Sequence, residues 1–142
     1  MRRHGWAIQG VLGEDSEQVP GFSYTVGLWG FGHPELVVFG LEYEHAGRLL
    51  NEVGEQIRGG LTLVGSEGAH AGSMHPSHRL RVFPVPNPES VILLAQEQYR
   101  TDGGRVIPAL QLVYADLLGA YPWEPRYRYP RWMQPMPGTF AA

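Results

Sequence analysis

The sequence contains no cysteine and no lysine, and each absence removes several kinds of chemistry. Without cysteine, the chain can form no disulfide, thiolate nucleophile, cysteine-ligated zinc site or iron–sulfur site. All 11 basic residues are arginine. A Schiff base, a phosphate-loop lysine and a Ser-Lys dyad are therefore excluded, and arginine remains as the anion-binding side chain.

The sequence also lacks an excess of positive charge and a long apolar run. The net charge is −3 and the arginines are scattered, so we predict no nucleic-acid partner. No apolar stretch approaches the roughly 20 residues needed to span a bilayer, and residues 1–4 lead into a half-polar segment rather than the apolar region of a signal peptide. We expect no membrane partner and a cytoplasmic location.

The size and composition indicate one globular domain. The chain has 142 residues, of which 43% are hydrophobic and 11% aromatic, which is typical of a protein with a packed core. We expect a single domain over residues 1–142, with a folded core at 1–118 and an extended tail at 119–142. Five prolines and a run of aromatic residues in the tail favour irregular structure there.

Hydrophobic periodicity predicts two helices and a set of short strands. Apolar residues at three-to-four-residue spacing indicate a helix over 43–58, and an Asn-Pro-Glu start indicates a second from 88 to about 100. Alternating or continuous apolar patterns predict strands. The expected strands are 5–12, 22–28, 35–41, 61–64, 79–85 and 106–114.

The order of these elements favours an α+β fold. It lacks the strict strand–helix alternation and the phosphate loop of a nucleotide-binding parallel sheet. We therefore predict a curved, mainly antiparallel sheet or partial barrel with two helices and a proline- and aromatic-rich C-terminal tail.

Five segments carry a resemblance to a known family. They are GWAIQGV (5–11), FSYTVGL (22–28), GHPELVV (32–38), ALQLV (109–113) and PWEP (122–125). In this order they resemble the bacterial family called Domain of Unknown Function 4262, over about residues 5–127. The resemblance implies no particular activity.

A second, fold-level resemblance is to flavin-reductase-like split barrels, which place a strand bearing Ser or Thr just before a proline turn. The residues available here to hold a flavin phosphate are few and separated in sequence. They are Ser23, Thr25, Arg79 and Arg81. We expect no bound cofactor, and a flavin-dependent oxidoreductase stays a further alternative.

His33 and Glu35 form the polar cluster that best suits catalysis. They lie in a turn that enters an apolar strand, where a rigid scaffold can hold them for general acid–base work. Their candidate roles are those of catalytic residues in a small hydrolase. In the structural alternative, His33 caps the turn and Glu35 pairs with an arginine such as Arg79 or Arg81.

Four further residues are candidate ligand-binding residues. Tyr24 and Thr25 alternate faces on one strand, so one hydroxyl is expected to face the core and the other a cavity. Trp123 and Glu124 offer an aromatic wall beside a carboxylate, or instead cover the sheet or a partner subunit. We predict one pocket bordered by Tyr24, His33, Glu35 and Trp123.

A metal site is not predicted. His70, His75 and His78 lie within nine residues, but their spacing is that of a Gly/Ser-rich loop rather than of two ligands on one helix face. A solvated loop is the simpler interpretation of this segment.

Our leading functional hypothesis is a bacterial accessory or regulatory module that binds a small molecule or another protein. The tail supports an additional expectation, because it gathers aromatic and sulfur-bearing side chains that are costly to leave in water. These are Trp123, Tyr127, Tyr129, Trp132, Met133 and Met136. We predict a symmetric homodimer through the tail; the alternative is an intramolecular strap over the protein's own sheet.

Overall fold

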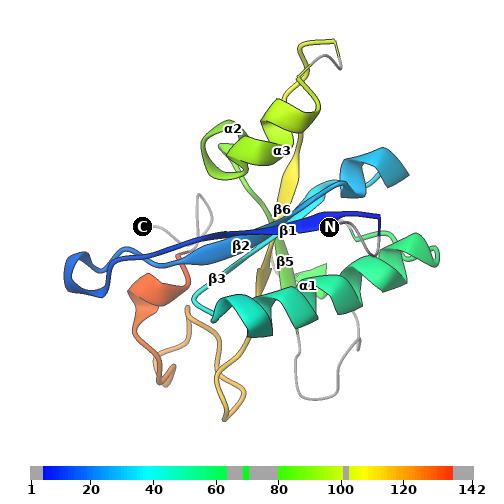
Figure 1. Cartoon of the computed structure of the whole chain (residues 1–142). Coiled ribbons are helices and arrows are strands. Elements are labelled where there is room, and N and C mark those ends of the chain that lie inside the picture. Colours follow the sequence, from blue (N-terminus) through cyan, green and yellow to red (C-terminus); the bar gives the residue numbers. More distant parts are fainter. Residues whose placement is uncertain (1–4, 64–68, 71–79, 101–102, 136–142) are drawn as a thin grey trace.

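The computed structural model describes residues 5–63, 69–70, 80–100 and 103–135. Within these ranges six strands form one open sheet in the order β1-β2-β3-β6-β5-β4 (Figure 1). The strands are β1 (Ala7–Val11), β2 (Phe22–Val26), β3 (Glu35–Phe39), β4 (Ala69–His70), β5 (Arg81–Pro84) and β6 (Ala109–Val113). The α+β class is therefore confirmed.

The sheet is mixed but mainly antiparallel. The β1–β2 hairpin pairs Ala7 with Val26 at one end and Val11 with Phe22 at the other. Among the described strands, only β3 and β6 run parallel, with Glu35 opposite Ala109. Their carboxyl ends consequently meet at the same edge of the sheet.

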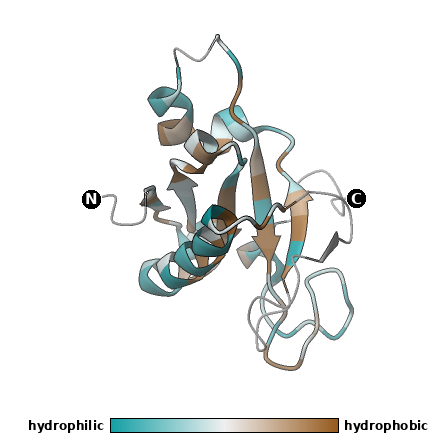
Figure 2. Ribbon diagram, turned by 90° about the vertical axis from the view of Figure 1, so that its right-hand side faces the viewer, coloured by the Kyte–Doolittle hydropathy of each residue, from teal (hydrophilic) through white to brown (hydrophobic). Residues whose placement is uncertain are grey.

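Helices cover the two faces of the sheet. Helix α1 (Tyr43–Arg58) lies on one side, and the short helices α2 (Pro88–Val91) and α3 (Leu93–Gln98) lie on the other (Figure 1). Figure 2 shows the strands mostly hydrophobic and the outer side of α1 hydrophilic. Each face thus has its own apolar core.

The helix expected over 43–58 is confirmed with these same bounds. Leu49, Leu50 and Val53 are buried against the sheet, and each contributes roughly 1.5 to 3 kcal/mol before entropy is subtracted. Gly54 allows the helix to approach the indole of Trp6, because a Cβ at this position would lie 2.4 Å from the ring. Packing on Trp6 therefore fixes the position of α1.

The second expected helix is broken. Residues 88–91 form α2 and 93–98 form α3, with Ile92 between them in a non-helical conformation. The Ile92 side chain is fully buried, and the hydroxyl of Tyr24 accepts the backbone N–H of Leu94 at 2.9 Å. Burial of one side chain and capping by a distant tyrosine therefore override the helical pattern.

Other boundaries also differ from the expected ones. Leu28, predicted as the end of a strand, begins a 3-10 helix, η2 (Leu28–Phe31), within the segment expected to be a turn. Residues 61–63 form no strand, and Val64 lies outside the described residues. β1, β2, β3, β5 and β6 are shorter than expected, and β4 lies in a segment that was expected to be a loop.

The described part of the tail is irregular apart from a 3-10 helix, η3 (Arg131–Met133). It folds back onto the sheet, where Tyr121, Tyr127 and Gln134 are buried. Tyr121 packs with Phe83 of β5 and Val113 of β6. Among the described residues there is no helix with the length and apolar character needed to cross a membrane.

Candidate functional site

Glu35, the first residue of β3, has a fully buried carboxylate that accepts four hydrogen bonds. The hydroxyl of Thr25 donates at 2.7 Å. The backbone N–H groups at the start of η2 supply the others, from Gly27 at 2.9 Å, Leu28 at 3.1 Å and Trp29 at 3.2 Å. Glu35 therefore holds η2 against the sheet and makes no contact with solvent, since its exposed fraction is 0%.

Burial raises the pKa of Glu35, and the hydrogen bonds from Thr25 and the three backbone N–H groups oppose that shift only in part. The four donors all point at lone pairs of the carboxylate. Both oxygens of Glu35 already accept hydrogen bonds from Thr25 and from the backbone at the start of η2, so an ion pair with Arg79 or Arg81 is not required.

His33 is also buried, with an exposed fraction of 3%. Its Nε2 accepts the backbone N–H of Leu63 at 3.0 Å, and its Nδ1 lies 2.8 Å from the carbonyl oxygen of Pro34. This pairing fits the tautomer with its proton on Nδ1. The ring thus joins the turn before β3 to the segment after α1.

Tyr24 and Thr25 do not divide between core and cavity, because both are buried. The Tyr24 hydroxyl accepts the Leu94 N–H, and burial raises the pKa of this tyrosine while that hydrogen bond opposes the rise. The Thr25 oxygen donates to Glu35 and accepts the backbone N–H of Leu36 at 2.9 Å. Both hydroxyls are engaged inside the fold.

Trp123 and Glu124 cover the β5 side of the sheet. The Trp123 ring stacks on Tyr121 at 4.9 Å between centroids and meets Phe83 edge-on at 5.7 Å. One oxygen of Glu124 accepts the Tyr121 N–H at 2.8 Å. These contacts match the alternative in which the two residues cover the sheet.

The structure brings Thr25 and Glu35 into contact but does not gather the six candidate residues at one cavity. None of Tyr24, His33, Glu35 and Trp123 lines either of the two cavities described below. The catalytic assignment of His33 and Glu35 stays a prediction. Their burial and internal hydrogen bonds favour structural roles.

The residues considered for flavin and metal also take other places. Ser23 is buried and lines the hairpin cleft described below, and the Arg81 guanidinium lies 5.3 Å from the centre of the Tyr121 ring. Arg79, His75 and His78, and the side chain of His70, lie outside the described residues. Within the described ranges no three His, Asp or Glu side chains are grouped as a metal site would require.

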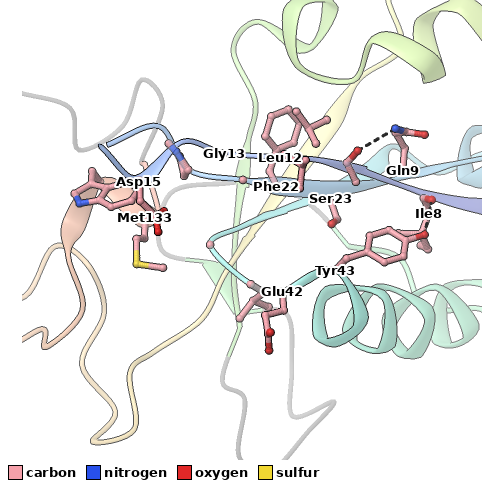
Figure 3. Close-up of a pocket in the computed structure, with 17 residues that line it drawn as sticks. Ile8, Gln9, Leu12, Gly13, Asp15, Phe22, Ser23, Glu42, Tyr43 and Met133 are labelled. Atoms are coloured by element: carbon pink, nitrogen blue, oxygen red, sulfur yellow. Dashed lines mark hydrogen bonds between the residues drawn. The ribbon is translucent and has the colours of Figure 1, made fainter. Parts of the chain in front are cut away.

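One cavity, which we call the hairpin cleft, encloses about 540 Å³ between the β1–β2 hairpin and the start of α1 (Figure 3). Tyr43 lies across one end, with its hydroxyl donating to the Ile8 carbonyl at 3.1 Å, and Met133 lies at the other end. The lining residues come from three segments. The first is the β1–β2 hairpin with residues 8–13, 15 and 20–23, the second is residues 40–43 before and at the start of α1, and the third is residues 132–133 of the tail.

The second cavity, which we call the tyrosine cavity, encloses about 520 Å³ at the carboxyl ends of the parallel strands β3 and β6. Residues 40–42 and His45 line it from the β3 side, and residues 114–117 from the β6 side. Tyr127, Tyr129 and Met133 of the tail close it. In sheets with parallel strands this edge is where ligands commonly bind.

The two cavities adjoin, because residues 40–42 and Met133 line both. Gly40 has a φ of +81°, and a Cβ there would lie 2.7 Å from the Met133 carbonyl oxygen and 2.8 Å from the Tyr114 hydroxyl. Only glycine fits this junction without displacement. Gly40 thereby lets the tail pass close to the end of β3.

Three tyrosines form walls of the tyrosine cavity. The Tyr114 hydroxyl donates to the Phe39 carbonyl at 2.9 Å, and the Tyr127 hydroxyl accepts from the Gln134 amide at 2.9 Å. The rings of Tyr127 and Tyr129 meet at 81°, with centroids 5.6 Å apart. Burial is the main cause that raises the pKa of Tyr114 and of Tyr127, so both phenols are neutral near pH 7.

Two carboxylates, Glu42 and Asp116, also line the tyrosine cavity. Burial raises the pKa of Asp116, but hydrogen bonds from the backbone N–H groups of Ala120, Arg128 and Leu118 outweigh it and leave the pKa below its usual value. Glu42 is exposed at the start of α1 and makes no capping hydrogen bond with its side chain. Asp116 is therefore ionised near neutral pH.

Sequence reasoning missed both cavities. The sequence does contain a buried strand, β3, followed by Gly40 and Glu42. This pattern predicts a binding site only if β3 is known to have a parallel neighbour. The pairing of β3 with β6 spans about 70 residues and is not visible in local pattern.

Comparison with known proteins identifies a family for the chain. No curated protein and no solved structure matches the chain. One family model, Domain of unknown function (DUF4262), matches residues 1–128. That match covers the six strands, helices α1 to α3 and most of the residues that line the tyrosine cavity, and the chain therefore belongs to the DUF4262 family.

Proposed function

We propose that this protein is a binding module that holds a small organic molecule in the tyrosine cavity, with the hairpin cleft as an adjoining subsite. The observation that carries the proposal is the position of the tyrosine cavity at the carboxyl ends of β3 and β6. Volumes of about 520 and 540 Å³ fall within the range of about 300–1,000 Å³ that is usual for ligand pockets.

The composition of the walls supports the same proposal. Leu41, Met133 and the tyrosine rings supply apolar surface, while Glu42 and Asp116 supply two polar groups. Ligand sites typically combine such apolar walls with a few placed polar groups that orient the ligand. The wall therefore suits a molecule that is partly apolar and partly polar.

Binding is favoured over hydrolysis at His33 and Glu35. A general acid or base must come within hydrogen-bond reach of its substrate, directly or through one water. Both side chains are buried, and their polar atoms already pair with the protein's own backbone or with Thr25. A substrate would have to displace those partners first.

Fragment screening by NMR tests the proposal on the full chain labelled with 15N. We expect fragments that shift the amide signals of residues 40–42 and 114–117 while leaving those of residues 93–98 unchanged. In the variant Met133→Trp the added indole fills the junction of the two cavities, so these shifts should be lost.

Leu118→Trp is the matched control, because it adds the same indole at an exposed position that lines neither cavity. It should bind as the unmodified chain does. A screen without hits at residues 40–42 and 114–117, or hits that survive Met133→Trp, would contradict the proposal.

A further inference from the structure

We infer that the ligand of the tyrosine cavity is an organic cation, specifically a substituted ammonium ion with small apolar groups. This inference rests on the proposed binding function and names the class of ligand for that site. It follows from the arrangement of the rings, the charge of the lining residues and the apolar surface beside them.

The rings of Tyr127 and Tyr129 provide a corner suited to a cation. The two rings meet edge-to-face, at 81° with centroids 5.6 Å apart, so a face of the ring that presents its edge borders the angle between them. The face of an aromatic ring carries negative potential and attracts an ammonium group within about 6 Å of its centre. Tyr114 adds a third ring to the same cavity.

The charge of the lining favours the same ligand. Glu42 and Asp116 line the tyrosine cavity and Asp15 lines the adjoining hairpin cleft. Among the described residues, His45 lines the tyrosine cavity as a basic side chain, and no arginine lines either cavity. Two arginines lie nearby. Arg128 acts electrostatically on Asp116 without lining the cavity, and Arg131 donates to the carbonyls of Pro122 and Glu124.

Glu42 is the carboxylate best placed to meet a ligand. It is exposed, and it forms no side-chain hydrogen bond or ion pair with any described residue. Asp116 accepts three backbone N–H groups, so it supplies charge at a fixed position rather than a free hydrogen-bond acceptor. A cation over the tyrosine rings would interact with both.

The apolar groups of the cation have a surface to cover. Leu41, Leu117 and Met133 line the tyrosine cavity together with the rings. Methyl groups on the nitrogen would contact these side chains and would lower the cost of taking the charge out of water. A substituted ammonium ion therefore matches the walls better than a metal ion or a phosphate does.

Choline and its neutral carbon isostere, 3,3-dimethylbutan-1-ol, form a matched pair of probes with the same shape. We expect choline to shift the signals of residues 40–42 and 114–117 in low salt, with a dissociation constant at least about 5-fold lower than that of the isostere. Equal or tighter binding of the isostere would overturn the inference and leave the binding module standing.

Two other outcomes separate the inference from the function on which it rests. If fragments bind this cavity but choline does not, the inference is overturned and the proposed function stands. If no fragment and no cation binds, both are overturned.

Two pairs of variants test the role of charge without disturbing the core. Leu117→Arg replaces a lining leucine, 91% exposed at the rim, by a positive charge, and the added charge together with the lost apolar contact should weaken choline binding about 2- to 5-fold. Leu118→Arg is the control, since Leu118 is 65% exposed and lines neither cavity.

The second pair is Glu42→Gln with Glu44→Gln as its control. Glu42 directly precedes α1 and Glu44 lies in its first turn, and both are exposed, but only Glu42 lines a cavity. Glu42→Gln should weaken choline binding about 2- to 5-fold. Equal effects within either pair would overturn the inference.

Discussion

The side-chain amide of Gln134 pairs with both backbone polar groups of Tyr114. Its Oε1 accepts the Tyr114 N–H at 3.1 Å, and its Nε2 donates to the Tyr114 carbonyl oxygen at 3.0 Å. The same Nε2 donates to the Tyr127 hydroxyl at 2.9 Å. One buried side chain thus takes the place of a strand partner at the end of β6 and fixes the tail that closes the tyrosine cavity.

Replacing this amide should loosen the tail. In Gln134→Leu the backbone groups of Tyr114 lose their partners while they stay buried, so we expect the free energy of unfolding to fall by about 2 to 4 kcal/mol. Urea denaturation measures the change. Gln98→Leu, at an exposed position of α3, is the control and should stay within about 0.5 kcal/mol of the unmodified chain.

Removal of the tail should destabilise the fold for the same reason. A chain ending at Gly119 loses the buried side chains of Tyr121, Tyr127 and Gln134, and we expect a lower urea midpoint than for the full chain. An unchanged midpoint would mean that the tail adds nothing to the fold.

The predicted homodimer is a separate question. It was inferred from the aromatic residues of the tail, but Tyr121 and Tyr127 are buried against the protein's own sheet. The dimer stays a prediction, and light scattering tests it: a full-length monomer at high micromolar concentration would contradict it.

Two glycines of α1 should respond in opposite directions to substitution by alanine. At Gly54 a Cβ would lie 2.4 Å from the Trp6 ring, so overpacking should cost about 1 to 3 kcal/mol, more than the gain in helix propensity. At Gly47 nothing lies within 4 Å, so Gly47→Ala should stabilise the protein by about 0.5 to 1 kcal/mol. Thermal unfolding compares the two variants, and a stabilising Gly54→Ala would contradict the packing of Trp6 on α1.

The pH dependence of stability should reveal the buried carboxyl of Glu35. Burial raises its pKa in the folded state, so the folded protein binds this proton more tightly than the unfolded chain does. The contribution of Glu35 to the free energy of unfolding is therefore largest below the ordinary pKa of about 4.3, and it decreases as the pH rises through the folded-state pKa.

Glu35→Gln isolates this contribution. The Nε2 of the new glutamine faces backbone N–H donors, so the variant should be less stable than the unmodified chain at every pH. The difference in their free energies of unfolding should become smaller as the pH rises from about 4 to 7, because the unmodified chain loses the contribution of Glu35. Urea denaturation across this range gives the difference. Glu44→Gln should show no such trend, and a difference that widens with pH would contradict the direction of the shift.

Local patterns in the sequence predicted the elements that local physics determines. The bounds of α1 were correct because its apolar stripe is regular over four turns. The buried strand β3 was expected because its apolar run is continuous. The break at Ile92 was not expected, since it depends on Tyr24, which lies about 70 residues away in the chain.

The candidate site also combines features that local sequence patterns predict with features that depend on distant contacts. Thr25 was singled out as a candidate ligand-binding residue and Glu35 as a candidate catalytic residue. The structure joins the two by a hydrogen bond, and Glu35 also holds η2 through the backbone N–H of Gly27. Residues 40–42 and 114–117 meet only because β3 and β6 are parallel, and a glycine followed by ordinary residues carries no local sign of a cavity. The cavity depends on the pairing of two strands that are far apart in the sequence, so local sequence patterns could not predict it.

A crystal structure of the protein with the strongest fragment from the NMR screen tests the central claim most directly. The account predicts that the ligand lies between residues 40–42 and 114–117, with its polar or charged group facing the rings of Tyr127 and Tyr129. A ligand bound at another surface, with the tyrosine cavity filled by side chains of the chain itself, would contradict it.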